Sequence, residues 1–210
     1  VMAAAIAFVQ HDLKKVLAYS TMSQLAYIFT GLGCAMFLAN TLDWQTDADA
    51  HYIVIGGFGA ALFHLFNHAM AKGMLFMASG SVIHEVHHAH HHLHHHDDHH
   101  DDHGDHDEGH EEEFDAQSMD NMGGLASKMP LTATAMLVGS ASIMGLPLIG
   151  GFWSKEGIIA NAWRVALEDP RFFLPAMCVL VGAAMTGFYM SHLPAILLSL
   201  VPLACILPSL

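Results

Sequence analysis

Apolar runs long enough to cross a lipid bilayer constrain this chain more than any other sequence feature. A helix needs roughly 20 apolar residues to span the hydrocarbon core, and runs of this size cover residues 16–38, 52–83 and 172–190. A fourth run, 131–165, is interrupted by Gly145-Leu146-Pro147 and Gly150-Gly151. Because lipid leaves backbone polar groups without partners outside helices and closed barrels, we expect an all-α polytopic transmembrane bundle. It should contain four spans, one of them broken, with residues 1–10 as the tail of another.

One polar insert, residues 84–115, carries almost all of the net charge of −13. It holds 14 His, 12 Asp or Glu and no Lys or Arg, which leaves 8 acids against 7 bases in the rest of the chain. That remainder is about 60% apolar, far above the composition of soluble domains, and it has no basic patch for nucleic acid. The insert has too few apolar residues to form a core, so we expect residues 84–121 to be a disordered loop.

Neither the histidine runs nor the cysteines indicate a specific metal-binding site. His90, His91, His92, His94, His95 and His96 offer imidazoles for weak, adventitious binding of zinc, nickel or copper. A tolerated low-complexity segment is the favoured interpretation; a metal buffer and a proton-collecting antenna, since imidazoles titrate near physiological pH, are the alternatives. Three cysteines, Cys34, Cys178 and Cys205, have no paired spacing, so we expect buried small side chains.

The distribution of basic residues orients the bundle. Lys14 and Lys15 lie directly before the run 16–38, and Lys128 lies just before the run 131–165, whereas the loop 40–51 carries three Asp and no base. Positively charged loops favour the cytoplasmic side, which places the Lys14 hinge and the insert there. Arg164 and Arg171 fall on the opposite side and weaken this inference.

Three protonatable side chains occur within the apolar run 52–83. His64, His68 and Lys72 are spaced i, i+4, i+8, which places them within about 80° of one helix face. A charged residue at the centre of a span costs about 2.5–3.5 kcal/mol on insertion scales, and a structural helix has no need of that cost. The pattern favours a proton relay over polar side chains that only hold helices together.

The preceding span carries a milder polar stripe. Ser20, Gln24, Tyr27 and Gly31 share a face, and helix association explains such small and hydroxylated residues well. The alternative is a lining for water beside the relay. Lys14 at the mouth of this span is a candidate relay residue or an interfacial lysine that only extends to the membrane surface.

The interrupted run 131–165 predicts a discontinuous helix. Discontinuous helices mark ion sites in transporters, and Lys155 follows the break, next to Glu156. We expect Lys155 to exchange a proton and Glu156 to stabilise its charged form. An ordinary kink with an interfacial ion pair is the alternative.

Four motifs together carry a family resemblance. Residues 12–25, 62–84, 122–125 and 151–156 resemble the antiporter-like L subunit of respiratory complex I, which is equivalent to mitochondrial subunit 5 and related to the multisubunit antiporters of the Mrp type. The resemblance runs from the first residues to about Tyr189. It implies a fold of fourteen transmembrane helices with two inverted repeats, each containing a broken helix, of which this chain would be the second repeat.

The resemblance also implies a function and the residues that serve it. The family translocates protons, driven by quinone reduction elsewhere in the complex. Lys72 matches the central relay lysine with His64 and His68 beside it, Lys155 matches the lysine of the second broken helix, and Lys14 matches the lysine that begins its span. We therefore expect an NADH–quinone oxidoreductase subunit that has no redox centre or cofactor of its own. NADH, FMN, Fe–S clusters and quinone would belong to partner subunits.

The chain departs from the family pattern in its insert and at both ends. We expect transmembrane helices in residues 1–83, the loop in 84–121, further helices in 122–190 and an apolar tail in 191–210 that departs from the pattern. The first repeat and the lateral helix of the family are missing. These departures indicate an internal or truncated fragment, or a frameshift near Met190.

Three other classes remain as alternatives. An Mrp-type sodium–proton antiporter shares the ancestry, a divalent-metal transporter would explain the His-rich loop, and a membrane scaffold needs no chemistry. Fixed positive charge at Lys72 and Lys155 disfavours the metal transporter. The expected partners are antiporter-like membrane subunits, lipid and protons, without nucleic acid. The expected location is a bacterial or archaeal plasma membrane, with the mitochondrial inner membrane as the alternative.

Overall fold

The computed structural model describes the chain outside residues 98–114, 120–121, 123 and 199–210. The described residues form helices and turns, and contain no β-strand beyond one isolated bridge between Asp12 and Ser118. The helices are α1 (Met2–Phe8), α2 (Leu13–Thr41), α3 (Ala48–Asp97), α4 (Leu125–Lys128), α5 (Pro130–Met144), α6 (Gly150–Glu168), the 3-10 helix η2 (Pro170–Phe172) and α7 (Phe173–Leu198).

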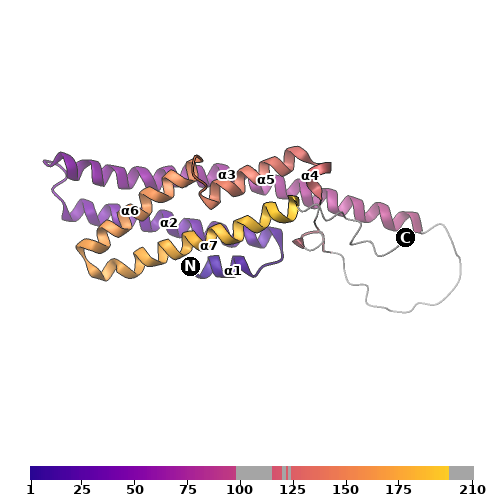
Figure 1. The fold of residues 1–210 in the computed structure, drawn as a ribbon, viewed down its shortest axis with the longest axis horizontal. Helices are drawn as coiled ribbons and strands as arrows, with labels where there is room; N and C mark the ends of the chain where they lie inside the picture. Colours follow the sequence, from indigo (N-terminus) through magenta and orange to yellow (C-terminus); the bar gives the residue numbers. More distant parts are fainter. Residues whose placement is uncertain (98–114, 120–121, 123, 199–210) are drawn as a thin grey trace.

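The long helices run side by side along one axis (Figure 1). Helix α3 is the longest, with 50 residues, and packs against α2, α5 and α6. Helices α5 and α6 follow one another along the bundle, and α7 packs against both of them. The start of α2 and the far end of α3 lie toward the same end of the bundle (Figure 1).

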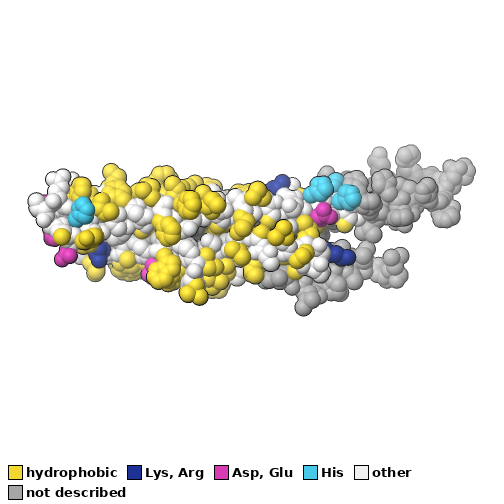
Figure 2. Space-filling model, turned by 90° about the horizontal axis from the view of Figure 1, so that it is seen from above, with side chains coloured by type: hydrophobic (Ala, Val, Ile, Leu, Met, Phe, Trp, Pro, Cys, Tyr) yellow, Lys and Arg dark blue, Asp and Glu magenta, His cyan; other side chains and the backbone are white. Residues whose placement is uncertain are grey.

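Length and composition make this bundle a membrane protein. Three helical segments, Leu13–Thr41, Ala48–Ala89 and Pro170–Leu193, are long and apolar enough to cross a bilayer, and Pro130–Met144 is a shorter apolar helix. Figure 2 shows apolar side chains over the middle of one face, with charged side chains mostly toward the ends. The predicted all-α transmembrane bundle is confirmed.

The predicted interruption of the fourth span lies between α5 and α6. Gly145 adopts φ 84° and ends α5 in the left-handed conformation, which glycine adopts without steric cost. Leu148 also has a positive φ, 81°, and is exposed, so the connection stores backbone strain. Helix α6 restarts at Gly150, and Gly151 lies directly against the carbonyl group of Ser142.

Two apolar clusters lie toward the ends of the bundle, and between them lie a smaller apolar cluster (Tyr27, Ile158 and Val179) and a layer of buried polar residues. One cluster contains Leu17, Leu75 and Met136 near the start of α2, and the other contains Leu38 and Val165 near its end. Helices α2, α3, α6 and α7 contribute the buried polar residues of this layer, namely Ser20, Gln24, His64, His68, Lys72, Ser154, Lys155 and Thr186. This layer contains the candidate site.

Two expectations differ from the structure. Helix α3 continues through Asp97, although we expected disorder from residue 84. The first part of the insert extends a helix that is already formed, and adding a residue to a helix costs far less than starting one. Cys178 is exposed rather than buried, whereas Cys34 is buried as expected. Cys178 lies on the outer face of α7, where apolar side chains are also exposed; Cys205 lies outside the described residues.

Candidate functional site

The three ionisable residues predicted to share a face lie on one uninterrupted stretch of α3. His64, His68 and Lys72 are all buried, with 3%, 7% and 5% of their surface exposed. The rings of His64 and His68 stack with their centroids 6.4 Å apart and an angle of 24° between their planes. The common face predicted from the i, i+4, i+8 spacing is therefore present, and it points into the bundle.

Lys72 is held by the neighbouring helix α2. Its Nζ donates to the carbonyl oxygen of Leu17 at 2.8 Å and to Oγ of Ser20 at 2.5 Å. Both acceptors are neutral, and none of the ion pairs among the described residues involves Lys72. The polar stripe of α2 thus contacts the face of α3 that carries His64, His68 and Lys72 (the predicted relay face). This contact agrees with either role of the stripe, helix association or a water lining.

His64 joins three helices through hydrogen bonds. Its Nε2 lies 3.1 Å from Oε1 of Gln24 on α2, and its Nδ1 lies 2.9 Å from Oγ of Ser154 on α6. Gln24 in turn donates from Nε2 to Oγ1 of Thr186 on α7 at 3.1 Å. The hydroxyl of Tyr189 also donates to Thr186, at 3.4 Å. The imidazole of His64 is the centre of this hydrogen-bonded network.

Lys155 lies at the break between α5 and α6 and is 5% exposed. Its Nζ donates to the carbonyl oxygen of Ile143 near the end of α5, and it lies 5.8 Å from the centroid of the Tyr27 ring. That distance is within the range of a cation–π contact. A carbonyl group and an aromatic face, both uncharged, therefore surround the ammonium group.

Glu156 does not join Lys155 in the structure. Its side chain is exposed on α6, and the ion pairs of the described residues include neither residue. Ser154 and Lys155 both face the core, and Glu156, a further 100° around the helix, lies outside this buried sector. The role expected for Glu156 at the lysine has no contact to support it here.

A small cavity separates the relay face of α3 from the helix break. Its volume is about 10 Å³, and Gln24, His64, Asn67, His68, Ser142, Ile143 and Gly151 line it. Among the described residues, Nε2 of His68 and Nδ2 of Asn67 are buried without a hydrogen-bond partner. Buried polar groups normally have partners, and a space of this size accommodates one water molecule.

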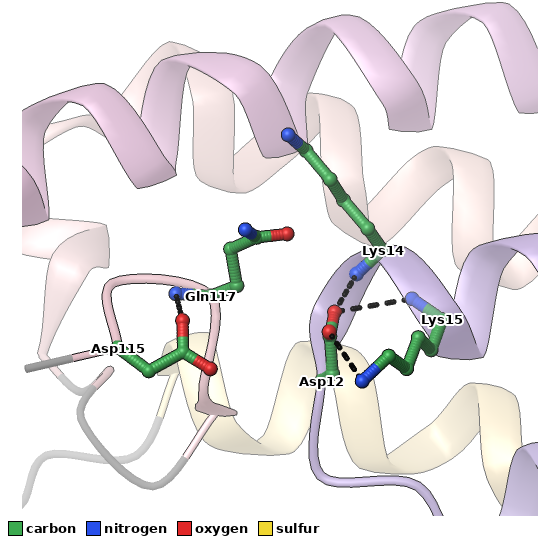
Figure 3. Close-up of polar contacts among 5 residues, drawn as sticks. All are labelled: Asp12, Lys14, Lys15, Asp115 and Gln117. Atoms are coloured by element: carbon green, nitrogen blue, oxygen red, sulfur yellow. Dashed lines mark hydrogen bonds and ion pairs between the residues drawn. The ribbon is translucent and has the colours of Figure 1, made fainter. Parts of the chain in front are cut away.

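Lys14 lies apart from this layer, at the start of α2. The Asp12 carboxylate caps the helix by accepting from the backbone N–H groups of Lys14 at 2.9 Å and Lys15 at 3.1 Å. Figure 3 shows the Lys15 ammonium turned toward Asp12, at 3.4 Å, and the Lys14 side chain directed away from it. Lys14 is exposed, so the structure does not bring it into contact with Lys72.

The hinge before α2 is tied to the segment that follows the insert. The backbone N–H of Leu13 donates to the carbonyl of Gln117 at 3.1 Å, and that of Met119 donates to the carbonyl of His11 at 2.8 Å. Gln117 is itself held in a turn by the Asp115 carboxylate at 2.8 Å (Figure 3). The segment that follows the insert is thereby held beside the start of α2.

Sequence reasoning missed the partners that complete the network. Ser154 lies 90 residues from His64, and Thr186 lies 162 residues from Gln24. A hydroxyl in an apolar run is a weak signal, because such residues commonly bond to the carbonyl of the preceding turn. Asn67 lies within the stretch 62–84, but it points to the break rather than along the relay face.

The described residues contain no group of three His, Cys, Asp or Glu side chains arranged to hold a metal ion. The side chains of residues 90–96, proposed above as weak metal ligands, lie outside the part of the structure in which side chains are described. That proposal stays a prediction.

Comparisons with known proteins identify the family to which the fold belongs. Residues 1–42 and 50–186 match the family model of the NADH:quinone oxidoreductase/Mrp antiporter transmembrane region. The chain is 38% identical over 187 residues to an NAD(P)H-quinone oxidoreductase chain 5 from Picosynechococcus sp.. It is 36% identical over 192 residues to the chloroplastic subunit 5 of Chaetosphaeridium globosum, and 35% identical over 190 residues to that of Glycine max.

These matches cover 89–90% of this chain and 19–22% of the relatives, so the chain spans about a fifth of their length. Their extent agrees with the resemblance on the four motifs, and the family match ends at residue 186, close to the expected departure near Met190. The chain belongs to the NADH:quinone oxidoreductase/Mrp antiporter transmembrane family.

Proposed function

We propose that this chain is part of a proton-translocating membrane subunit of an NAD(P)H–quinone oxidoreductase, and that protons pass through its buried polar layer. One observation carries the proposal. Four ionisable side chains are buried in the bundle: His64, His68 and Lys72 lie inside the apolar span Ala48–Ala89, and Lys155 lies on α6 beside the helix break. A purely structural bundle has no need of them there. Intramembrane ionisable residues of this kind mark proton relays and ion pathways.

The contacts support transfer between the two lysines. Lys72 and Lys155 each donate to a backbone carbonyl, and His64 and His68 lie between them on the relay face. A lysine without a carboxylate partner can give up its proton without leaving an uncompensated negative charge behind. His68 and the small cavity connect the relay face to the break, which allows one water molecule to complete the path.

An Mrp-type sodium–proton antiporter is the second candidate, because the family description includes both kinds of protein. The similar proteins named above are quinone oxidoreductase subunits, which favours the first candidate. A metal transporter is disfavoured by the two buried lysines, whose charge repels a divalent cation.

The experiment compares Lys72→Met with wild type in the full-length subunit, assembled in its complex and reconstituted in liposomes. We expect normal assembly and electron transfer to a soluble acceptor, with a strong loss of proton pumping. Lys15→Met is the matched control, because Lys15 is an exposed lysine on the same helix α2 that Lys72 contacts, and it should pump normally. Undiminished pumping by assembled Lys72→Met contradicts the relay, and sodium movement in place of protons selects the antiporter.

A further inference from the structure

Both ring nitrogens of His64 have a hydrogen-bond partner, but only one of them carries a hydrogen in the neutral imidazole. The partners therefore determine the tautomer. A neutral imidazole has one N–H donor and one acceptor nitrogen, and the partners of each nitrogen decide between them. Here the partners are Oε1 of Gln24 at Nε2 and Oγ of Ser154 at Nδ1. The hydroxyl of Ser154 can donate or accept, so the choice depends on Gln24.

Thr186 fixes the orientation of the Gln24 amide. The hydroxyl of Thr186 donates its single hydrogen to the carbonyl oxygen of Gly182 at 2.8 Å, one turn earlier in α7. Its oxygen is then an acceptor for its other neighbours, Nε2 of Gln24 at 3.1 Å and the hydroxyl of Tyr189 at 3.4 Å. Gln24 must therefore direct its NH₂ group to Thr186 and its carbonyl oxygen to His64.

A carbonyl oxygen only accepts, so the nitrogen facing it must carry the hydrogen. We propose that Thr186 is a positioning residue that acts through Gln24 to hold neutral His64 as the Nε2–H tautomer, so that a transferred proton arrives at Nδ1 beside Ser154. This inference rests on the proposed relay. It also gives proton transfer through His64 a direction, because Nδ1 faces Ser154 on α6, the residue that precedes Lys155.

The two contacts of Ser154 fit the two protonation states of His64. Its Oγ lies 2.9 Å from Nδ1 of His64 and 3.1 Å from the carbonyl oxygen of Gly151, and one hydroxyl hydrogen serves only one of them. With Nδ1 neutral, Ser154 donates to the imidazole. When Nδ1 takes up a proton it becomes a donor, so the Ser154 hydroxyl accepts from it and turns its own hydrogen to Gly151. The Nε2–H group keeps its bond to Gln24 throughout.

Thr186→Val removes the hydroxyl and keeps the shape, so Gln24 loses the acceptor that orients it. We expect proton pumping by the assembled complex to fall about two- to tenfold, the range set by one neutral hydrogen bond, and Thr186→Ser to restore it. Thr30→Val is the matched control, because Thr30 makes the same bond to the preceding turn, at 2.8 Å to Ala26, and its half-buried side chain has no part in the network. It should pump normally.

A spectroscopic measurement separates positioning from a general loss of packing. Histidine labelled with ¹⁵N in the full complex, with His64→Gln as the difference reference, should show a protonated Nε2 and an unprotonated Nδ1 in wild type. Thr186→Val should shift that signal toward a mixture of tautomers, and Thr186→Ser should retain it. The opposite tautomer in wild type, or an unchanged tautomer in Thr186→Val, overturns the inference.

A double variant tests whether Thr186 acts through Gln24. If it does, Gln24→Met combined with Thr186→Val should lose no more pumping than Gln24→Met alone, whereas multiplied losses contradict the inference. Failure of the relay itself is distinguishable: His64→Gln then pumps normally. A His64→Gln variant that fails to pump beside a normal Thr186→Val variant refutes only the role of Thr186.

Discussion

Alanine substitutions at three glycines, one of them at the break between α5 and α6, should change the free energy of unfolding by different amounts. The space around each glycine predicts their order. A Cβ at Gly151 overlaps the carbonyl oxygen of Ser142, and one at Gly157 lies 2.6 Å from Cβ of Ala60 on α3, whereas one at Gly33 has no atom within 4 Å. Overpacking that neighbouring groups can absorb costs about 1–3 kcal/mol, which we expect for Gly157→Ala. The Ser142 oxygen belongs to the backbone and has no rotamer to change, so Gly151→Ala should cost about 3 kcal/mol or more.

The free energy of unfolding checks this order, measured by titrating a denaturing detergent into micelles of the full-length subunit. A loss of 3 kcal/mol lowers the ratio of folded to unfolded protein by about a hundredfold. Gly33→Ala is the control, since alanine is the better helix former by up to about 1 kcal/mol, and it should be as stable as wild type or more so. A Gly151→Ala variant as stable as Gly33→Ala refutes the backbone contact between α5 and α6.

Two further predictions concern the surroundings of Lys155. Arginine keeps the positive charge but does not release a proton near neutral pH. Lys155→Arg should therefore impair proton pumping in proteoliposomes nearly as much as Lys155→Ala. Full activity of the Arg variant would show that Lys155 has only a structural role. Tyr27→Phe removes the hydrogen bond from the phenol to the carbonyl oxygen of Val179, 2.5 Å long, and keeps the ring beside Lys155. It should lower the free energy of unfolding by about 0.5–1.5 kcal/mol, while Tyr52→Phe, at a residue that is 76% exposed, leaves it unchanged.

The sequence predicted those parts of the molecule that depend on neighbours along the chain. Hydropathy located the spans, and the Gly and Pro residues around Gly145 located the break, because both signals act within a few residues. The spacing of His64, His68 and Lys72 fixed their common face as soon as a helix was assumed. The stripe on α2 likewise predicted that Ser20 and Gln24 face the same direction, and these residues contact Lys72 and His64.

Contacts between distant helices could not be predicted in the same way. The positions of Thr186 and Ser154 depend on how α7 and α6 lie against α2 and α3, and no local pattern encodes that arrangement. The exposure of Glu156 follows from the rotation of α6 about its axis, which the packing of Lys155 against α5 determines. The helical extension to Asp97 was missed because composition indicates whether a segment folds by itself. It does not indicate whether the segment continues a helix that precedes it.

The backbone acceptors of the two lysines have an evolutionary consequence. Leu17 and Ile143 supply carbonyl oxygens, and no codon change at either position removes a carbonyl. Both residues can therefore drift among apolar side chains while the lysines keep their acceptors. Apart from loss of the Ser20 hydroxyl, which Lys72 also contacts, inherited variation that disables the lysines without replacing them must alter the spacing of the helices, as a bulkier residue at Gly151 does. Natural variants with impaired transport should thus concentrate at small residues between helices, including many without a polar atom in their side chain.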